Sequence, residues 1–134
     1  MKQAMTESIL TIAQWHEKTF PAATLQTQTD KFADELKELR EEMTKQPADI
    51  ESVFMELADC AIVACGLCRW GMAGARAFAS VVAITEKIEL PNDINPVTML
   101  TASIERKMEI NRKRIWANDN GKYQHIEQGD KDER

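Results

Sequence analysis

The chain has 134 residues, of which 43% are hydrophobic, so it is long enough for one domain with a buried core. Its net charge of −5 argues against nucleic acid as the main partner. The longest apolar stretch, residues 57–68, is too short to span a bilayer, and the opening MKQAMTES lacks the apolar run of a secretory leader. We therefore expect a soluble cytoplasmic protein that does not enter a membrane.

Good helix formers dominate the chain, and glycine and aromatic residues are few. Apolar periodicity and the helix-breaking prolines predict five helices, at residues 6–20, 22–45, 49–70, 75–89 and 96–116. Asp49 and Asn95 are the expected N-caps of the third and fifth helices. We find no strand alternation of useful length. The prediction is an all-α bundle over residues 1–126, followed by a charged mobile tail at 127–134.

Three cysteines, Cys60, Cys65 and Cys68, fall close together in the third predicted helix. An odd number without a secretory signal favours reduced thiols. The C-x-x-C spacing of the last two is compatible with zinc or redox chemistry, but no second pair follows. Buried structural thiols are the preferred interpretation.

Two pairs of acidic residues have the three-residue spacing that places side chains on one helix face. Glu56 and Asp59 form the first pair, and Asp59 is the only charged residue within the apolar stretch 57–68. Burying unpaired carboxylates costs several kcal/mol each, so we expect a cationic partner there. Glu35 and Glu38 form the second pair, on the preceding helix. A short loop makes the two helices antiparallel neighbours, so the four carboxylates can converge.

Oxygen ligands without histidine or cysteine favour Mg²⁺, or Mn²⁺, over zinc. A di-iron bundle would require Glu-x-x-His, which neither His16 nor His125 completes. For the Glu35 and Glu38 pair alone, a solvated face paired with neighbouring lysine and arginine residues is the competing interpretation. The two pairs together favour a metal site.

The fifth predicted helix carries Lys107, Asn111 and Arg114 at spacings of four and three, in line with the apolar Leu100 and Ile104. The inward face of this helix thus changes from apolar to cationic toward its end. Cationic groups on a core-facing stripe need an anionic partner, and phosphate is a natural one. A solvated basic face is the alternative.

The order Glu35-x-x-Glu38 and then Glu56-x-x-Asp59 resembles the all-α nucleoside triphosphate pyrophosphohydrolases, the MazG-like family, although Asp34 stands where that family usually has a second Glu. The stretch from Lys107 to Arg114 resembles the phosphate-contacting helix of the related dimeric dUTP-hydrolysing enzymes. The opening from Gln14-Trp15 to Phe20-Pro21 is similar to the start of MazG-like domains. The ending, from Trp116 to Ile126, is similar to a phage and bacterial branch that acts on purine deoxynucleotides.

This resemblance implies an Mg²⁺-dependent hydrolase that cleaves nucleoside triphosphates to monophosphate and pyrophosphate. The four carboxylates (Glu35, Glu38, Glu56 and Asp59) would hold the metal, and Glu38 would also activate the attacking water. The implied substrate-binding residues are Lys107, Asn111 and Arg114 for phosphate and sugar and Gln14 and Trp15 for the base. Packing is the competing role for Trp15. The resemblance also implies a homodimer or homotetramer. The alternative is a helical interaction module that keeps the bundle without catalysis.

Overall fold

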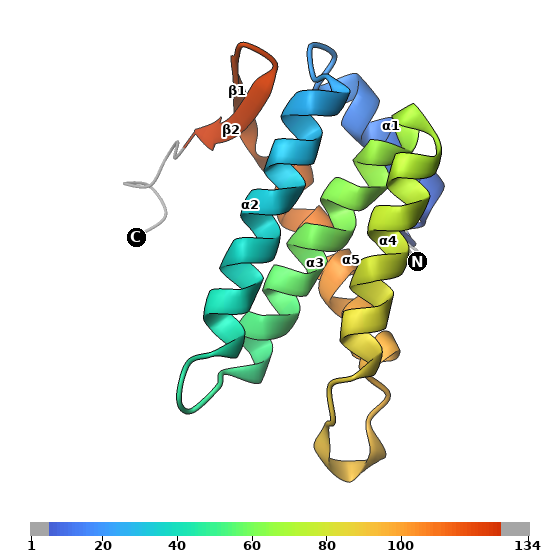
Figure 1. Cartoon of the computed structure of the whole chain (residues 1–134). Helices are drawn as coiled ribbons and strands as arrows, with labels where there is room; N and C mark the ends of the chain where they lie inside the picture. Colours follow the sequence, from blue (N-terminus) through green and yellow to red (C-terminus); the bar gives the residue numbers. More distant parts are fainter. Residues whose placement is uncertain (1–5, 127–134) are drawn as a thin grey trace.

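The computed structural model describes residues 6–126 as a helical bundle with a short hairpin at its end (Figure 1). The elements in order are α1 (Ile9–Thr19), α2 (Leu25–Met43), α3 (Ile50–Leu67), α4 (Met72–Glu86), α5 (Pro96–Lys113), β1 (Ile115–Asp119) and β2 (Lys122–Ile126), with single 3₁₀ turns η1 (Cys68–Trp70) and η2 (Pro91–Asp93). The predicted all-α bundle of about five helices is confirmed. The tail predicted at 127–134 lies outside the described residues.

Polar side chains begin the helices where the sequence predicts them. The Asp49 carboxylate accepts hydrogen bonds from the first free backbone N–H groups of α3, and the Asn95 amide oxygen does the same for α5. Ser8 and Thr24 cap α1 and α2, each in a reciprocal pair with a threonine three residues later. These caps satisfy backbone donors that have no partner inside the helix.

Helix α3 is the centre of the bundle, because it packs against each of the other four helices. Apart from Glu56 and Asp59, its residues from Val53 to Leu67 are almost all apolar, and Phe54, Leu57 and Ala61 are fully buried. Burying a large apolar side chain contributes about 1.5–3 kcal/mol, so this helix anchors the fold. Cys60 and Cys65 are buried free thiols, as predicted, while Cys68 is half-buried.

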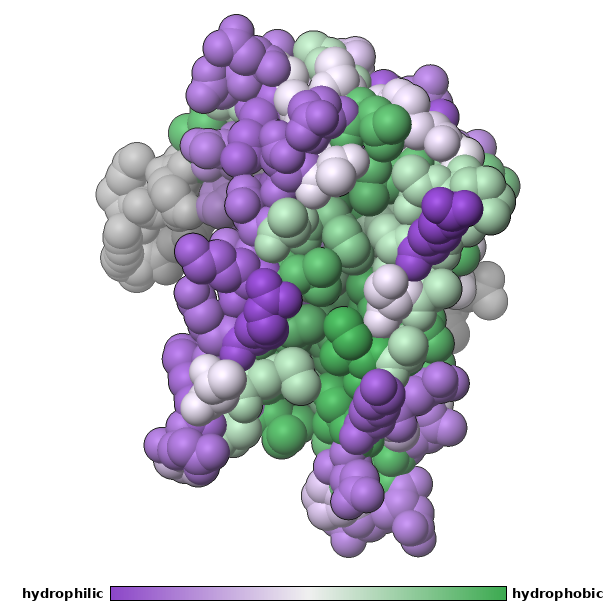
Figure 2. All heavy atoms as spheres, viewed as in Figure 1, coloured by the Kyte–Doolittle hydropathy of each residue, from purple (hydrophilic) through white to green (hydrophobic). Residues whose placement is uncertain are grey.

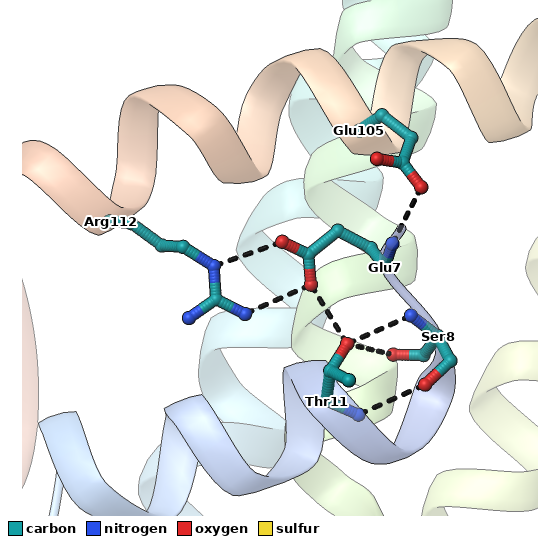
Figure 3. Close-up of polar contacts among 5 residues, drawn as sticks. All are labelled: Glu7, Ser8, Thr11, Glu105 and Arg112. Atoms are coloured by element: carbon teal, nitrogen blue, oxygen red, sulfur yellow. Dashed lines mark hydrogen bonds and ion pairs between the residues drawn. The ribbon is translucent and has the colours of Figure 1, made fainter. Parts of the chain in front are cut away.

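A polar cluster ties the segment before α1 to α5 (Figure 3). The Arg112 guanidinium donates two hydrogen bonds of 2.9 Å to the Glu7 carboxylate, and the Glu7 backbone N–H donates to Glu105 at 2.7 Å. Thr11 donates a further hydrogen bond to Glu7 at 2.8 Å. The bidentate geometry makes this pair stronger than an ordinary surface ion pair.

The prediction of a fifth helix to residue 116, with no strand after it, is wrong. Helix α5 ends at Lys113, and β1 pairs antiparallel with β2, with Trp116 opposite His125. The turn between the strands is Asn120-Gly121, and both residues have positive φ, of 54° and 89°. This is the conformation that a two-residue hairpin turn requires and that Asn-Gly tolerates. The hairpin returns to the bundle, where the Tyr123 hydroxyl accepts a hydrogen bond from the Ala22 N–H.

Helix α4 begins at Met72, three residues before the predicted start, so Gly74 lies inside the helix and not at the turn. A Cβ at Gly74 would overlap the backbone of Cys68, which explains why a glycine fits within this helix. Its buried residues form one stripe, Gly74, Ala77, Val81 and Thr85. Figure 2 shows apolar surface exposed along the middle of the molecule, between α2 and α4. None of the helices within residues 6–126 is long and apolar enough to cross a membrane.

Candidate functional site

Carboxylates from α2 and α3 converge at one point. Glu35, Glu38 and Glu56 each bring one oxygen atom within 4.8 Å of the other two. Glu35 is buried, Glu56 is half-buried and Glu38 is exposed, so the group lies at an opening in the surface of the bundle. At about 100° per residue along α2, Glu35 lies on the side of the buried Leu39 and Glu38 lies further round the helix, toward solvent.

Two of these carboxylates lack a partner for an oxygen atom. Oε1 of Glu35 and Oε1 of Glu56 are buried and accept no hydrogen bond within the described chain, although Oε2 of Glu35 lies 3.5 Å from Lys31 Nζ. Desolvation and the neighbouring carboxylates, Asp59 above all, raise the pKa of Glu35 to about 7. Desolvation and nearby carboxylates, again with Asp59 first, raise the pKa of Glu56 to about 7 as well. An oxygen-only group with orphaned buried atoms fits a hard divalent cation such as Mg²⁺.

Asp59 lies next to these three glutamates, but its carboxylate forms an ion pair with a lysine of α5. Its Oδ1 is 3.3 Å from Nζ of Lys107 on α5, and both side chains are largely buried. Burial raises the pKa of the Asp59 carboxyl, and the Lys107 ammonium opposes that shift. The four predicted carboxylates are therefore neighbours, but the closest group contains only three of them, because Lys107 holds the fourth.

The predicted cationic stripe of α5 faces the same place. Lys107, Asn111 and Arg114 all line a cavity of about 260 Å³ that also contains Glu35 and Asp59. Asn111 is buried, and its Oδ1 accepts a hydrogen bond of 3.2 Å from Arg114. Other basic residues of this helix point elsewhere, where Arg106 pairs with Glu51 and Arg112 with Glu7. The basic residues thus lie on two faces: Lys107 and Arg114 line the cavity, while Arg106 and Arg112 pair with carboxylates outside it.

Aromatic side chains from α1 and the hairpin form the other end of the cavity. Trp15, Phe20, Trp116, Tyr123 and His125 line it. Phe20 contacts Trp15, Trp116 and Tyr123 with ring centroids 4.8–5.2 Å apart. Trp15 packs against Phe20 and also lines the cavity, so its packing role does not remove it from the cavity wall. Gln14, the other predicted base-pocket residue, is exposed and is not among the cavity residues.

A buried histidine lies beneath the aromatic end. His16 is 2% exposed, and its Nε2 lies 3.0 Å from Oε1 of Gln28, which is 4% exposed. Its Nδ1 lies 3.3 Å from Nη1 of Arg69, which also donates to the Phe20 carbonyl oxygen at 3.0 Å. Desolvation lowers the pKa of His16 to about 4, so the ring is neutral near pH 7. Gly66 of α3 allows this packing, because a Cβ there would overlap the imidazole ring.

Sequence reasoning missed Gln28, His16 and the hairpin aromatics as cavity residues. The Asn120-Gly121 pair was the available signal for the hairpin. Nothing in the sequence marks Gln28, because a glutamine in the first turns of an amphipathic helix is ordinarily solvated. Comparisons of the chain with protein-family models, curated proteins and solved structures found no match.

Proposed function

We propose that this protein is an Mg²⁺-dependent nucleoside triphosphate pyrophosphohydrolase, which cleaves (d)NTP to (d)NMP and pyrophosphate. One observation carries the proposal: two carboxylates with buried, unpartnered oxygen atoms meet a third beside a cavity that also contains basic and aromatic side chains. Buried carboxylates of this kind need a cation, and the remainder of the cavity suits a polyphosphate joined to a flat ring. The resemblance to the MazG-like family points to the same reaction.

The carboxylates would hold the cation, with Mn²⁺ able to replace Mg²⁺. Glu35, Glu38 and Glu56 would bind it, and Asp59, which now pairs with Lys107, would be the fourth carboxylate ligand. A bound cation supplies Lewis-acid stabilisation of phosphoryl oxygens and a more acidic water. Glu38 is the exposed member of the group, which supports a role for it in orienting or deprotonating a water that would enter from solvent.

The α5 residues would bind the phosphates. Lys107 and Arg114 supply positive charge to the phosphoryl oxygens, and the Asn111 amide positions sugar or phosphate. Trp15 would stack on the base. A preference for purine deoxynucleotides rests on the resemblance alone, and Gln14 would take part only if another subunit brings it to a cavity.

The experiment is a substrate panel. Purified protein with Mg²⁺ should release pyrophosphate, not phosphate, from at least one of the eight common nucleoside triphosphates. Glu38→Gln and Asp59→Asn should each abolish release. Glu41→Gln is the matched control, because Glu41 is an exposed glutamate on α2 outside the carboxylate group.

Inactivity across the whole panel would contradict the hydrolase proposal. The alternative of a helical interaction module without catalysis predicts that inactivity, and it also predicts no rise in melting temperature with Mg²⁺ and a non-hydrolysable triphosphate. A hydrolase should be stabilised by both together, because ligands that bind only the folded state raise its stability by mass action.

We also propose that the chain forms a homodimer or homotetramer. Helix α4 buries one stripe of small residues, while Ala79 on another face is exposed. Figure 2 also shows apolar surface exposed between α2 and α4. A second copy of the chain would cover it.

A further inference from the structure

Gln28 is a buried polar residue whose hydrogen-bonding capacity is only partly used. It lies in the first turns of α2 and lines the cavity together with Trp15 and Tyr123. Its carbonyl oxygen is 3.0 Å from His16, and that is the one hydrogen bond its side chain makes within residues 6–126. The amide nitrogen of Gln28 makes no hydrogen bond to the described residues, and it is not among the buried atoms that lack a partner, so its N–H groups are free to donate to a ligand that fills the cavity.

The orientation of the Gln28 amide follows from a chain of hydrogen bonds. A guanidinium group can only donate, so Nδ1 of His16 must accept from Arg69. A neutral imidazole then carries its hydrogen on Nε2, which must donate to Gln28. The atom of Gln28 that faces His16 is therefore the oxygen, and the –NH₂ group is left for the cavity. Arg69 thus determines which end of a side chain on another helix is available to a ligand.

We propose that Gln28 determines base specificity by donating a hydrogen bond from its amide nitrogen to an acceptor atom on the nucleobase, with Arg69 and His16 as its positioning residues. This inference rests on the proposed function, since it assigns the base end of the same cavity. The ligand group is a flat ring with a carbonyl oxygen or an unprotonated ring nitrogen at its edge.

The position of Gln28 agrees with this assignment. Gln28 and Glu35 are seven residues apart on α2, which is two helical turns, or about 10 Å, along one face. That separation is comparable with the distance from the reacting phosphates of a nucleotide to the edge of its base. The surrounding rings suit stacking, and buried Nε1 of Trp116 is a second N–H donor at this end without a partner in the described chain.

The test measures binding and does not need catalysis. Nucleoside triphosphates are titrated into the full chain by calorimetry with Ca²⁺ in place of Mg²⁺, and the tightest one is compared with analogues that each lack one acceptor on the base, such as the 3-deaza and 7-deaza purines. In the wild type, one such deletion should weaken binding by about 10-fold, the equivalent of one hydrogen bond. In Gln28→Met the parent nucleotide should bind about 10-fold more weakly, and the same deletion should cost nothing further.

Two further variants test whether the lost discrimination comes from the missing –NH₂ group or from a disturbed fold. Gln28→Glu keeps an oxygen for His16 and removes the –NH₂ group, so it should lose the same discrimination while remaining folded by circular dichroism. Gln26→Met is the matched control, because Gln26 is exposed on the same helix, where its side chain donates to Asp30. It should bind every analogue as the wild type does.

The positioning role of Arg69 has its own readout. Arg69→Met frees the His16 tautomer and lets the Gln28 amide rotate, so the ratio of affinities between parent and analogue should fall toward one, and Arg69→Lys should restore part of it. A purely structural role would change all affinities equally and leave that ratio intact.

The inference is overturned if the deletion costs the same in Gln28→Met as in the wild type, or if no analogue differs from its parent. Selective binding without pyrophosphate release under Mg²⁺ would support Gln28 while contradicting the hydrolase. Failure of every nucleotide to bind would contradict both.

Discussion

The most informative single residues are buried groups whose charge state depends on a partner. Glu35 and Glu56 are carboxyls with raised pKa because they are desolvated next to other acids, and His16 is an imidazole with lowered pKa because it is desolvated among aromatic rings. Each of these pKa shifts makes the unfolding free energy depend on pH, because the same group has its ordinary pKa in the unfolded chain. The raised pKa values of Glu35 and Glu56 make the unfolding free energy fall as the pH rises, whereas the lowered pKa of His16 makes it rise. The two contributions can therefore be measured separately.

Metal binding should weaken as the pH falls. Glu35 and Glu56, each with a pKa of about 7, must lose their protons to bind a cation. We expect the Mg²⁺-induced rise in melting temperature to be large at pH 8 and small at pH 6, with protons released to a weakly buffered solution on binding. Glu35→Gln should remove most of the rise. A shift that does not depend on pH over this range would contradict the raised pKa values.

His16 should make stability fall in acid. Its pKa is about 4 in the folded chain and about 6.5 in a model peptide, so between these values the unfolded state binds more protons. The stabilisation is complete above pH 6.5 and is lost as the pH falls to 4, at a cost of about 3 kcal/mol. The measurement is the unfolding free energy of the wild type minus that of His16→Gln across this range. The ring protons of His16 should titrate near pH 4 by NMR, and a midpoint near 6.5 would refute the assignment.

At the scale of elements, the site is built where separate pieces of chain meet. Helices α2 and α3 bring the carboxylates, α5 brings the cationic stripe, and the hairpin brings aromatic rings to the far end of the cavity. The hairpin is attached through Tyr123 to Ala22 and through Lys122 to Asp34. It closes one side of the cavity by packing, since Trp116 contacts Phe20.

Gly121 should be essential for this closure. Its φ of 89° is unfavourable for any other residue, and a Cβ there would lie 2.9 Å from the Ala22 carbonyl oxygen. Gly121→Ala should destabilise the protein by about 1–2 kcal/mol and raise KM more than it lowers kcat, because the loss is at the base end. Unfolding curves and steady-state kinetics check both parts. Asn120→Gly, which tolerates the same turn, should be close to the wild type in each.

At the scale of the whole molecule, the proposed association of two or more copies can be tested on the exposed face of α4. A charge on that face should weaken association without disturbing the fold. Ala79→Lys should therefore shift the mass measured by light scattering toward that of one chain, about 15 kDa, while its circular dichroism stays unchanged.

Ala102→Lys is the matched control for the association prediction, because it makes the same substitution at an exposed position of α5. It should leave the mass as it is in the wild type. A wild type that has the mass of a single chain at high concentration would refute the assembly.

Much of this protein can be predicted from its sequence, because the strongest signals are local. The caps at Asp49 and Asn95, the apolar α3 and the acidic pairs all follow from spacing along a helix, which is a property of neighbouring residues. The facing of α2 and α3 follows from the short loop between them. For the same reason, the sequence alone is enough to place the carboxylate group and the cationic stripe.

Only the tertiary structure decided how distant side chains share their partners. Lys107 takes Asp59 away from the other three carboxylates, and Arg69 fixes the tautomer of His16 and thereby the amide of Gln28. These contacts join residues that are 12 to 53 positions apart in the sequence. Each contact forms because folding removes the polar groups from water, so that they must find partners within the protein. Periodicity determines the face on which a residue lies, but the partner across the core is chosen by packing.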